Sequence, residues 1–241
     1  MMQLFDKLYN KDKNEFYKLV YHNLKNNKKM FIVTANPETF MKSEEDSQLN
    51  DLLKDQNTLL VPDGIGIVKI AQKLGYDVKE RVTGIDISNI LLEYGSNLKK
   101  SIYLFGAKQE VIDLMKGVLE SKYPSLKIVG MSNGYVEDKD KVFKEIKKLK
   151  PDIILVALGI PEQEKIIYKH INDFEKGIFI GVGGSFDVIS GSKKRAPKVF
   201  IDLNLEWLYR IITEPKRLKR FYNSNIKFIF KVKKVRRREN D

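Results

Sequence analysis

A chain of 241 residues with 42% hydrophobic residues is long enough for a domain with a substantial core, and it is too apolar for wholesale disorder. The absence of cysteine excludes disulfides, thiol catalysis and Cys-ligated zinc, and two histidines leave little room for a His-based metal site. The longest apolar run, at 153–158, is far shorter than the ~20 residues of a membrane-spanning helix, and the N-terminus lacks the apolar stretch of a signal peptide.

The net charge of +12 is distributed unevenly along the chain. Residues 1–191 are nearly balanced, with 28 basic and 27 acidic residues, whereas residues 192–241 hold 16 basic and 5 acidic residues. The chain is therefore a nearly neutral body with a basic end, and we predict a body of residues 1–195 and an appendage of residues 196–241. A basic end of this kind is typical of proteins that bind nucleic acid, an anionic membrane surface or a phosphorylated ligand.

In chain order, the body alternates strand-like and helix-like segments. Runs of β-branched and apolar residues predict strands at 30–34, 58–61, 101–105, 127–131, 153–158 and 177–182. Apolar residues spaced three or four apart predict helices at 65–73, 88–98, 110–119, 139–149 and 163–174. This alternation favours an α/β fold with a largely parallel, Rossmann-like sheet and helices on both of its faces.

The appendage has a helical pattern of its own. Leu203, Trp207 and Ile211 recur at helical spacing within 200–213, and the segment 225–238 mixes apolar side chains with seven basic residues. Basic and aromatic residues interleaved in this way are typical of an amphipathic helix at a membrane interface. RNA binding uses similar residues, and an ordinary packed helix with a solvated basic end is the plainer interpretation.

Each predicted strand ends in small or polar residues, and these loops are expected to form a cleft. Carboxyl ends of parallel strands meet at one edge of a sheet, and ligands bind there. Glycines allow the backbone to approach a ligand and helix N-termini favour anions, so a nucleotide-like phosphorylated molecule is the expected guest. The candidate contacts from these loops are Gly106, Gly134, Tyr135, Gly183 and Gly184. Any one of the loops, taken alone, could be an ordinary turn.

Two charged residues near strand ends are candidates for chemistry. Asp63 directly follows a predicted strand, where a carboxylate can act as a general base, bind a ribose or cap the next helix. The adjoining Gly64-Ile65-Gly66 lacks the third glycine of a dinucleotide fingerprint and indicates NAD only weakly. Arg81 precedes a predicted helix and suits either a bidentate phosphate contact or a surface salt bridge.

The sequence favours no metal site and no cofactor. Asp138 and Asp140 have the Asp-x-Asp spacing that many nucleotide-sugar enzymes use for a divalent metal, but they open a predicted helix, where acidic residues are expected. His22 and His170 lie on helical patterns and are expected to be surface or packed residues rather than catalysts.

Several short motifs occur together in a fixed order. They are Thr-Ala-Asn-Pro-Glu at 34–38, Pro-Asp-Gly-Ile-Gly at 62–66, Arg-Val-Thr-Gly at 81–84, Leu-Phe-Gly-Ala at 104–107, Gly-Ile-Pro-Glu-Gln-Glu at 159–164, Gly-Val-Gly-Gly-Ser-Phe-Asp at 181–187, Lys-Arg-Ala-Pro at 194–197 and Leu-Glu-Trp-Leu-Tyr-Arg at 205–210. In this combination the chain resembles the WecG/TagA/CpsF glycosyltransferases from about residue 30 to about residue 221.

The resemblance implies an inverting, metal-independent transferase without a cofactor. It would move N-acetylmannosamine, or a related sugar, from a UDP donor to polyprenyl-diphosphate-linked N-acetylglucosamine, an early step towards wall teichoic acid or another surface polymer. Residues 1–195 would be the catalytic core, and residues 196–241 would dock on an anionic membrane and complete the active site. The enzyme would lie in the cytoplasm at the inner face of the bacterial plasma membrane, with self-association left open.

Carried over residue by residue, the resemblance also implies roles in the site. Asp63 would be the general base, and Thr34 and Asn36 would line the acceptor side of the pocket. Arg81 and Gln163 would contact polar groups of the donor or acceptor. The appendage residues that would reach the diphosphates are Arg210, Arg217 and Arg220.

Two other classes of function are kept beside the transferase. A dinucleotide-dependent oxidoreductase on the same kind of sheet predicts NAD binding, and the missing third glycine counts against it. A basic RNA-binding module predicts strongly salt-dependent nucleic-acid binding through residues 192–241 with an idle cleft. The motifs of the body would then have no purpose, so we expect no nucleic-acid partner.

Overall fold

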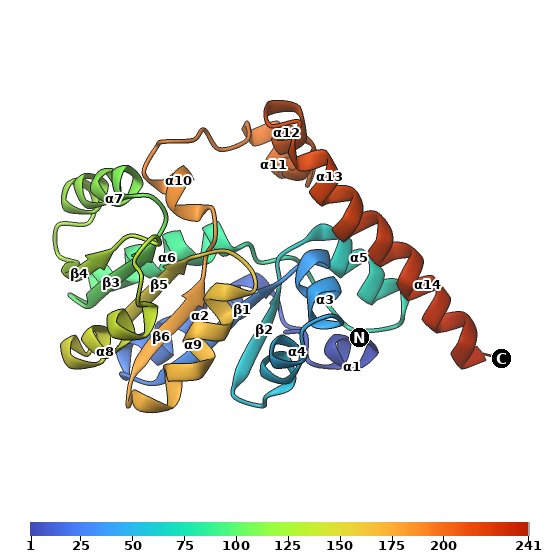
Figure 1. Ribbon diagram of the computed structural model, residues 1–241, viewed down its shortest axis with the longest axis horizontal. Coiled ribbons are helices and arrows are strands. Elements are labelled where there is room, and N and C mark those ends of the chain that lie inside the picture. The colour runs from blue at the N-terminus through green and yellow to red at the C-terminus, as the bar shows by residue number, and fades with distance from the viewer. Residues whose placement is uncertain (241) are drawn as a thin grey trace.

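A six-stranded sheet carries the site (Figure 1). The computed structural model describes the backbone of residues 1–240 and the side chains of residues 1–234. The strands are β1 (Lys29–Ala35), β2 (Thr58–Pro62), β3 (Ser101–Gly106), β4 (Lys127–Ser132), β5 (Ile153–Ala157) and β6 (Gly177–Gly181). They lie in the order β2-β1-β6-β5-β3-β4, and each neighbouring pair is parallel. The predicted parallel α/β fold is therefore confirmed.

Helices connect the strands as the alternating pattern predicts. The body contains α1 (Met2–Asp6), α2 (Lys13–Lys25), α3 (Pro37–Ser43), α4 (Ser47–Lys54), α5 (Ile65–Lys73), α6 (Gly84–Asn97), α7 (Gln109–Lys122), α8 (Lys139–Leu149), α9 (Glu162–His170) and α10 (Ser185–Ile189). Helix α6 begins earlier than its apolar spacing predicts, because the Thr83 side chain accepts a hydrogen bond from Asp86 N–H and caps it there. Helices α1 to α4 have no counterpart among the predicted segments.

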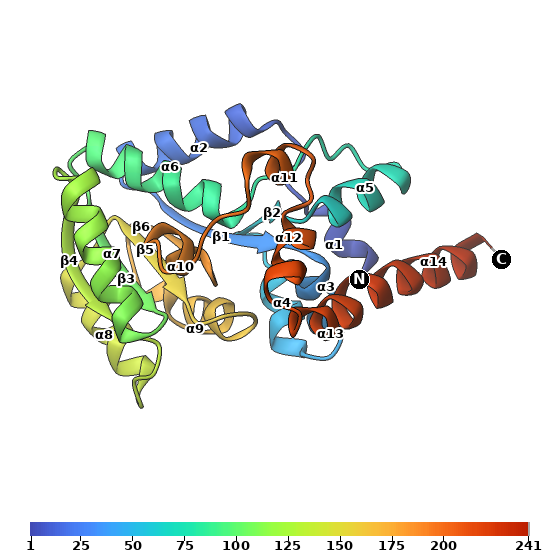
Figure 2. The ribbon, with the colours of Figure 1, turned by 90° about the horizontal axis from the view of Figure 1, so that it is seen from above.

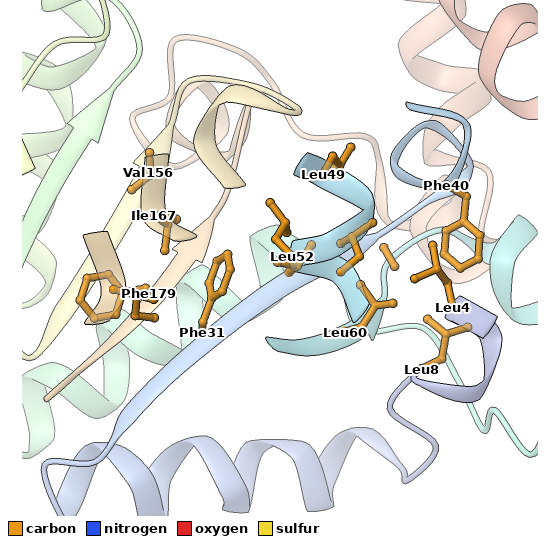
Figure 3. Packing of buried hydrophobic residues seen from close by; sticks show 14 of the residues in the cluster. Leu4, Leu8, Phe31, Phe40, Leu49, Leu52, Leu60, Val156, Ile167 and Phe179 are labelled. Carbon is orange, nitrogen blue, oxygen red and sulfur yellow. The ribbon is translucent and has the colours of Figure 1, made fainter. Parts of the chain in front are cut away.

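The inner strands β1, β3, β5 and β6 are buried on both faces, and successive side chains of each strand point to opposite sides. In β1, Phe31 and Val33 enter one buried cluster and Ile32 enters the other. Helices α3, α4, α8 and α9 cover the first face, while α2, α6 and α7 cover the second; Figure 2 shows α9 and α4 on the side of the sheet opposite α2 and α6. Figure 3 shows how Phe31 and Leu52 pack within the first cluster.

The appendage lies across the carboxyl edge of the sheet and then runs down the side of the body (Figure 1). It consists of α11 (Lys198–Asp202), α12 (Glu206–Thr213), α13 (Arg217–Phe221), a π-helical segment η2 (Tyr222–Ile226) and α14 (Lys227–Asn240). The helical spacing within 200–213 is divided between two helices, because Asn204 adopts a left-handed conformation with φ of 60° between them.

Helix α14 is attached to the body by apolar side chains. Phe228 and Val232 are buried in the same cluster as Phe5 and Phe40, and the ring centroids of Phe40 and Phe228 lie 5.6 Å apart. The expectation of an interfacial helix at 225–238 is therefore corrected for these two residues, which face the protein core. Phe230 remains exposed. The side chains of Val235 and of the arginines at 236–238 lie outside the described residues.

Within residues 1–240, no helix combines the length and the apolar composition that crossing a bilayer would require.

Candidate active site

A cavity of about 810 Å³ lies between the carboxyl edge of the sheet and the appendage. The loops that follow β1, β2, β3, β5 and β6 contribute to its lining, and the appendage contributes residues from α12, α13 and the turn between them. The loop after β4 does not contribute, because β4 lies at the end of the sheet opposite β2, whose loop holds Asp63. The predicted cleft is thus present, and the appendage forms the side of it that lies opposite the sheet.

Most of the predicted site residues come together in this cavity. They are Thr34, Asn36, Asp63, Arg81, Gln163, Gly183, Gly184, Arg210, Arg217 and Arg220. Gly106, Gly134 and Tyr135 are outside the lining. Gly106 has φ of 122°, and a Cβ there would lie 2.4 Å from the Ala157 carbonyl oxygen, so close packing of β3 against β5 accounts for this glycine. The substrate contacts predicted for these three residues stay predictions.

Asp63 is held at the carboxyl end of β2, beside the end of β1. In the sheet register Thr34 lies opposite Val61, and the Asp63 backbone N–H donates to the Ala35 carbonyl at 2.9 Å. The interpretation of Asp63 as a helix cap is wrong, because α5 begins after Gly64 and has no side-chain cap. The backbone N–H of Gly84, at the start of α6, instead favours the charged form of the carboxylate.

The surroundings of Asp63 suit a proton acceptor. Burial raises the pKa of its carboxyl group to about 6, with Glu206 acting in the same direction. Arg210, Arg81 and the Gly84 N–H favour the charged form and limit this rise. A carboxylate with a pKa near 6 is mostly ionised at neutral pH and is a stronger base than an ordinary aspartate.

Thr34 and Asn36 lie on the β1 side of the cavity. Thr34 is buried, with 6% of its surface exposed, at the end of β1. The Asn36 side-chain oxygen caps α3 by accepting from Glu38 N–H at 2.9 Å and Thr39 N–H at 3.1 Å. Because this oxygen is occupied, the Asn36 amide can offer a ligand its N–H groups, which are hydrogen-bond donors.

Arg81 forms an ion pair within the cavity rather than on the surface. Its Nη2 lies 3.2 Å from Glu206 Oε2, and both side chains are largely buried. Glu206 also lies 3.7 Å from Arg195 and 3.9 Å from Arg210. Sequence reasoning did not single out Glu206, although it stands in the Leu-Glu-Trp-Leu-Tyr-Arg motif at 205–210. The Glu206 carboxylate of the appendage therefore lies among Arg81 and Arg195 of the body and Arg210 of its own helix.

The other appendage arginines are paired with acids near the cavity. Arg217 contacts Glu214 at 2.7 Å, and Arg220 contacts Glu38 of α3 at 2.7 Å. These pairs hold the guanidinium groups over the cavity, where an incoming anion could replace the carboxylates as their partner. Asp187 and Lys193 also line the cavity and were not predicted, although Asp187 closes the motif at 181–187.

The Gln163 side chain is held by the loops that follow β5 and β6. Its Oε1 accepts from the backbone N–H groups of Gly159 and Gly183, each at 3.1 Å, and its Nε2 donates to Glu164 at 2.7 Å. A Cβ at Gly181 would lie 2.5 Å from Nε2, so the amide packs directly on the backbone of β6. Gly181 thus leaves room for the Gln163 side chain.

Gly181→Ala tests whether the placement of Gln163 matters for activity. Gly181 has no left-handed φ, so alanine fits its backbone, and the added methyl group would displace the Gln163 amide. We expect turnover to fall about tenfold or more, equivalent to losing one oriented hydrogen bond, and the melting temperature to fall because the buried hydrogen bonds of the amide are disturbed. Gly117→Ala is the matched control, because nothing lies near a Cβ there. Equal activity in both variants would mean that the position of Gln163 is unimportant.

No cluster of three or more His, Asp or Glu side chains suited to a metal occurs in the described part of the chain. Asp138 caps α8 by accepting from Lys141 N–H at 2.9 Å. Asp140 pairs with Lys169 and His170 at 2.7 and 2.6 Å. Asp138 therefore caps a helix and Asp140 forms ion pairs in its first turn, and the acidic residues at this helix start are as expected. Neither His22 nor His170 lines the cavity.

Comparison with known proteins identifies the family of the chain. The model of the glycosyl transferase WecG/TagA/CpsF family matches residues 3–241. The chain belongs to this family. Membership makes it a glycosyltransferase, in place of the oxidoreductase and RNA-binding alternatives. The resemblance noted on the short motifs is thereby confirmed, and it extends over both ends of the chain.

Three curated relatives carry the same name, N-acetylglucosaminyldiphosphoundecaprenol N-acetyl-beta-D-mannosaminyltransferase. The protein of Bacillus subtilis (strain 168) is 44% identical over 189 residues, which cover 78% of this chain and 73% of the relative. That of Bacillus spizizenii (strain ATCC 23059 / NRRL B-14472 / W23) is 39% identical, covering 82% and 76%. That of Staphylococcus aureus (strain NCTC 8325 / PS 47) is 37% identical, covering 87% and 82%.

Proposed function

We propose that this enzyme transfers an N-acetyl-β-D-mannosaminyl group from a UDP donor to N-acetylglucosaminyl-diphospho-undecaprenol, with inversion and without a metal ion. The names of the relatives support the sugar and the acceptor. The observation that carries the proposal is Asp63, a carboxylate with a raised pKa, which lines the cavity at the carboxyl edge of the sheet together with Arg81 and Arg210. Its product would enter the synthesis of wall teichoic acid or a related surface polymer.

Inversion requires one in-line displacement. An acceptor hydroxyl attacks the anomeric carbon, its proton passes to the Asp63 carboxylate, and the bond between that carbon and the UDP oxygen breaks. A donor with an α-linked sugar then gives a β-linked product, as in the names of the relatives. Thr34 and Asn36 line the same end of the cavity, so the proposal places the acceptor sugar against them.

The departing UDP gains negative charge, which the cavity can meet with cations and backbone donors. Arg81 and the appendage arginines line it, together with the glycines at 183 and 184. Fixed cations and N–H groups aimed at developing charge are an established means of lowering such a barrier. This arrangement supports metal-independent transfer, and it assigns the appendage a part in completing the active site.

The exposed surface of the appendage supports peripheral attachment to the cytoplasmic face of the membrane. Leu218, Tyr222 and Phe230 are exposed large apolar side chains on α13, η2 and α14. Basic residues flank them, and each lysine or arginine near an anionic leaflet contributes about 1 kcal/mol. A lipid-linked acceptor would reach the cavity from this side, and residues 196–241 would act as the membrane-docking unit of the proposed two-part organisation.

The function is tested by measuring UDP release from UDP-N-acetylmannosamine, with a prenyl-diphosphate N-acetylglucosamine analogue as acceptor, in buffer containing EDTA. We expect release that depends on the acceptor and survives EDTA. Turnover only after Mg²⁺ or Mn²⁺ is restored would contradict metal independence. Turnover with a different UDP-sugar would keep the transferase and change the donor, whereas no release with any UDP-sugar would contradict the proposal.

The pH dependence of kcat/KM tests the role of the carboxylate. A general base must be ionised, and the pKa of Asp63 is raised to about 6. Activity should therefore be constant above pH 7 and fall roughly tenfold for each pH unit below 6. A profile that is flat down to pH 5 would mean that a group other than Asp63 accepts the proton.

A further inference from the structure

Glu164 is a buried acid beside the cavity that the proposed mechanism does not use. It follows Gln163 in the first turn of α9, and 1% of its side chain is exposed. It does not line the cavity. Its Oε1 accepts from Gln163 Nε2 at 2.7 Å, while its Oε2 has no hydrogen-bond partner among the described residues. A buried carboxyl group costs free energy, so its retention here calls for a compensating role.

The bonds of Gln163 define what that side chain can offer to a ligand. Both backbone donors, from Gly159 and Gly183, reach its Oε1, which fixes the oxygen and the nitrogen of the amide. One Nε2 hydrogen goes to Glu164. The second has no partner within the described residues, and Gln163 lines the cavity. Gln163 can therefore present only a hydrogen-bond donor to whatever occupies the site.

We propose that Glu164 is a positioning residue, which orients the Gln163 amide so that its remaining Nε2 hydrogen donates to an oxygen of the bound nucleotide. The nature of this ligand rests on the proposed function, whereas the orientation of the amide does not. Without Glu164 the amide would keep its two backbone donors but lose the acceptor that holds its nitrogen. The donor would then be free to tilt away from the ligand.

The proposal holds in both protonation states of Glu164. Burial raises the pKa of its carboxyl group to about 7, and the hydrogen bond from Gln163 opposes this rise. Lys42 also favours the charged form, whereas Glu38 disfavours it. A proton on the unpartnered Oε2 leaves Oε1 as an acceptor, so the bond to Gln163 persists whether the group is neutral or ionised.

A double-mutant cycle separates positioning from a purely structural role. UDP binding is measured by calorimetry for the wild type, Glu164→Ala, Gln163→Ala and the double variant. If Glu164 acts through Gln163, we expect each single variant to bind about tenfold more weakly and the double variant to bind no more weakly than Gln163→Ala. Losses that multiply in the double variant, or unchanged binding in Glu164→Ala, would overturn the proposal.

Two further variants sharpen the cycle. Glu164→Gln keeps an oxygen in reach of Gln163 Nε2, so its UDP affinity should stay close to that of the wild type while Glu164→Ala loses affinity. Glu162→Gln alters the neighbouring acid, which is half-exposed and pairs with Lys139 at 3.0 Å, and it should bind UDP normally. Equal weakening in all three variants would indicate a general effect of charge on α9 and would contradict positioning.

A readout without ligand distinguishes failure of this inference from failure of the proposed function. In the free protein, the Gln163 side-chain amide, assigned by its loss in Gln163→Ala, should give an NMR signal protected from exchange with solvent. The protection should disappear in Glu164→Ala. If UDP does not bind the wild type but this pattern holds, the proposed donor is wrong and the positioning stands. Protection that survives Glu164→Ala overturns the positioning whatever the ligand.

Discussion

Asp63→Asn should remove nearly all turnover and at the same time stabilise the folded protein at pH 8. Asparagine cannot accept the proton of the acceptor hydroxyl, and general-base catalysis contributes roughly 100- to 10,000-fold in rate. The stabilisation has a separate cause, because burial raises the pKa of Asp63 to about 6 and makes its ionised form costly in the fold. Loss of activity with a gain in stability marks a functional residue rather than a structural one.

The sign of the stability effect follows from the direction of the pKa shift. A carboxyl group whose pKa is raised in the fold destabilises the protein fully above that pKa, and the cost disappears as the pH falls towards the unfolded value of 3.8. The complete shift corresponds to about 3 kcal/mol, and partial solvent exposure reduces the expected gain to about 1–2 kcal/mol at pH 8. The gain should vanish near pH 4.

Urea unfolding at pH 8 and pH 4 measures this effect, and Asp86→Asn is a control of opposite sign. Burial raises the pKa of Asp86, but hydrogen bonds from Arg195, Thr83 and Lys13 outweigh it and leave the pKa below its usual value. This group therefore stabilises the fold above its unfolded pKa, and Asp86→Asn should destabilise the protein at pH 8. A destabilised Asp63→Asn variant would show that the carboxylate is retained for stability.

Phe228→Ala should destabilise the protein by about 3–5 kcal/mol, the usual cost of removing a fully buried phenylalanine. The Phe228 ring is 0% exposed and packs 5.6 Å from Phe40 and 6.3 Å from Phe5, between centroids. Together with Val232 it is the main apolar attachment of α14 to the body. Its removal leaves a cavity between α14, α3 and α1.

Phe230→Ala is the matched control, because this residue lies two positions later in α14 and is 66% exposed. It should change the free energy of unfolding by less than about 0.5 kcal/mol. Hydrogen exchange of residues 206–234 shows whether Phe228→Ala releases the appendage locally or lowers the stability of the whole protein. Local release should also reduce activity, since Arg210, Arg217 and Arg220 would leave the cavity. Equal stability of the two variants would contradict the proposed attachment.

Much of the fold was predictable because its signals are local. The six strands are short β-branched and apolar runs, and the periodicity at 65–73 and 139–149 matches α5 and α8. Parallel strands bring their carboxyl ends to one edge, so Thr34, Asp63 and Gln163 could be assigned to a common cleft from their places after strands. The basic end was visible in the distribution of charge.

Other features depended on which elements become neighbours. Strand order places β4 at the end of the sheet opposite β2 and Asp63, so the loop with Gly134 and Tyr135 does not reach the cavity, although its composition resembles that of the others. Taken by its sequence alone, Glu206 has the pattern of a solvated acid on a helix. The fold instead buries it against Arg81, which lies far away along the chain. Burial and charge pairing across such distances have no local pattern.

In the appendage, too, some features follow from the sequence and others only from the tertiary structure. Its sequence determined a basic helix with apolar residues on more than one face, which is compatible with either a membrane or a protein core. The tertiary structure decided that Phe228 and Val232 pack on the body while Phe230 stays exposed. The physical reason is that periodicity specifies which side chains share a face of a helix, whereas the partner of each face is set by the apolar surface that α1 and α3 leave uncovered.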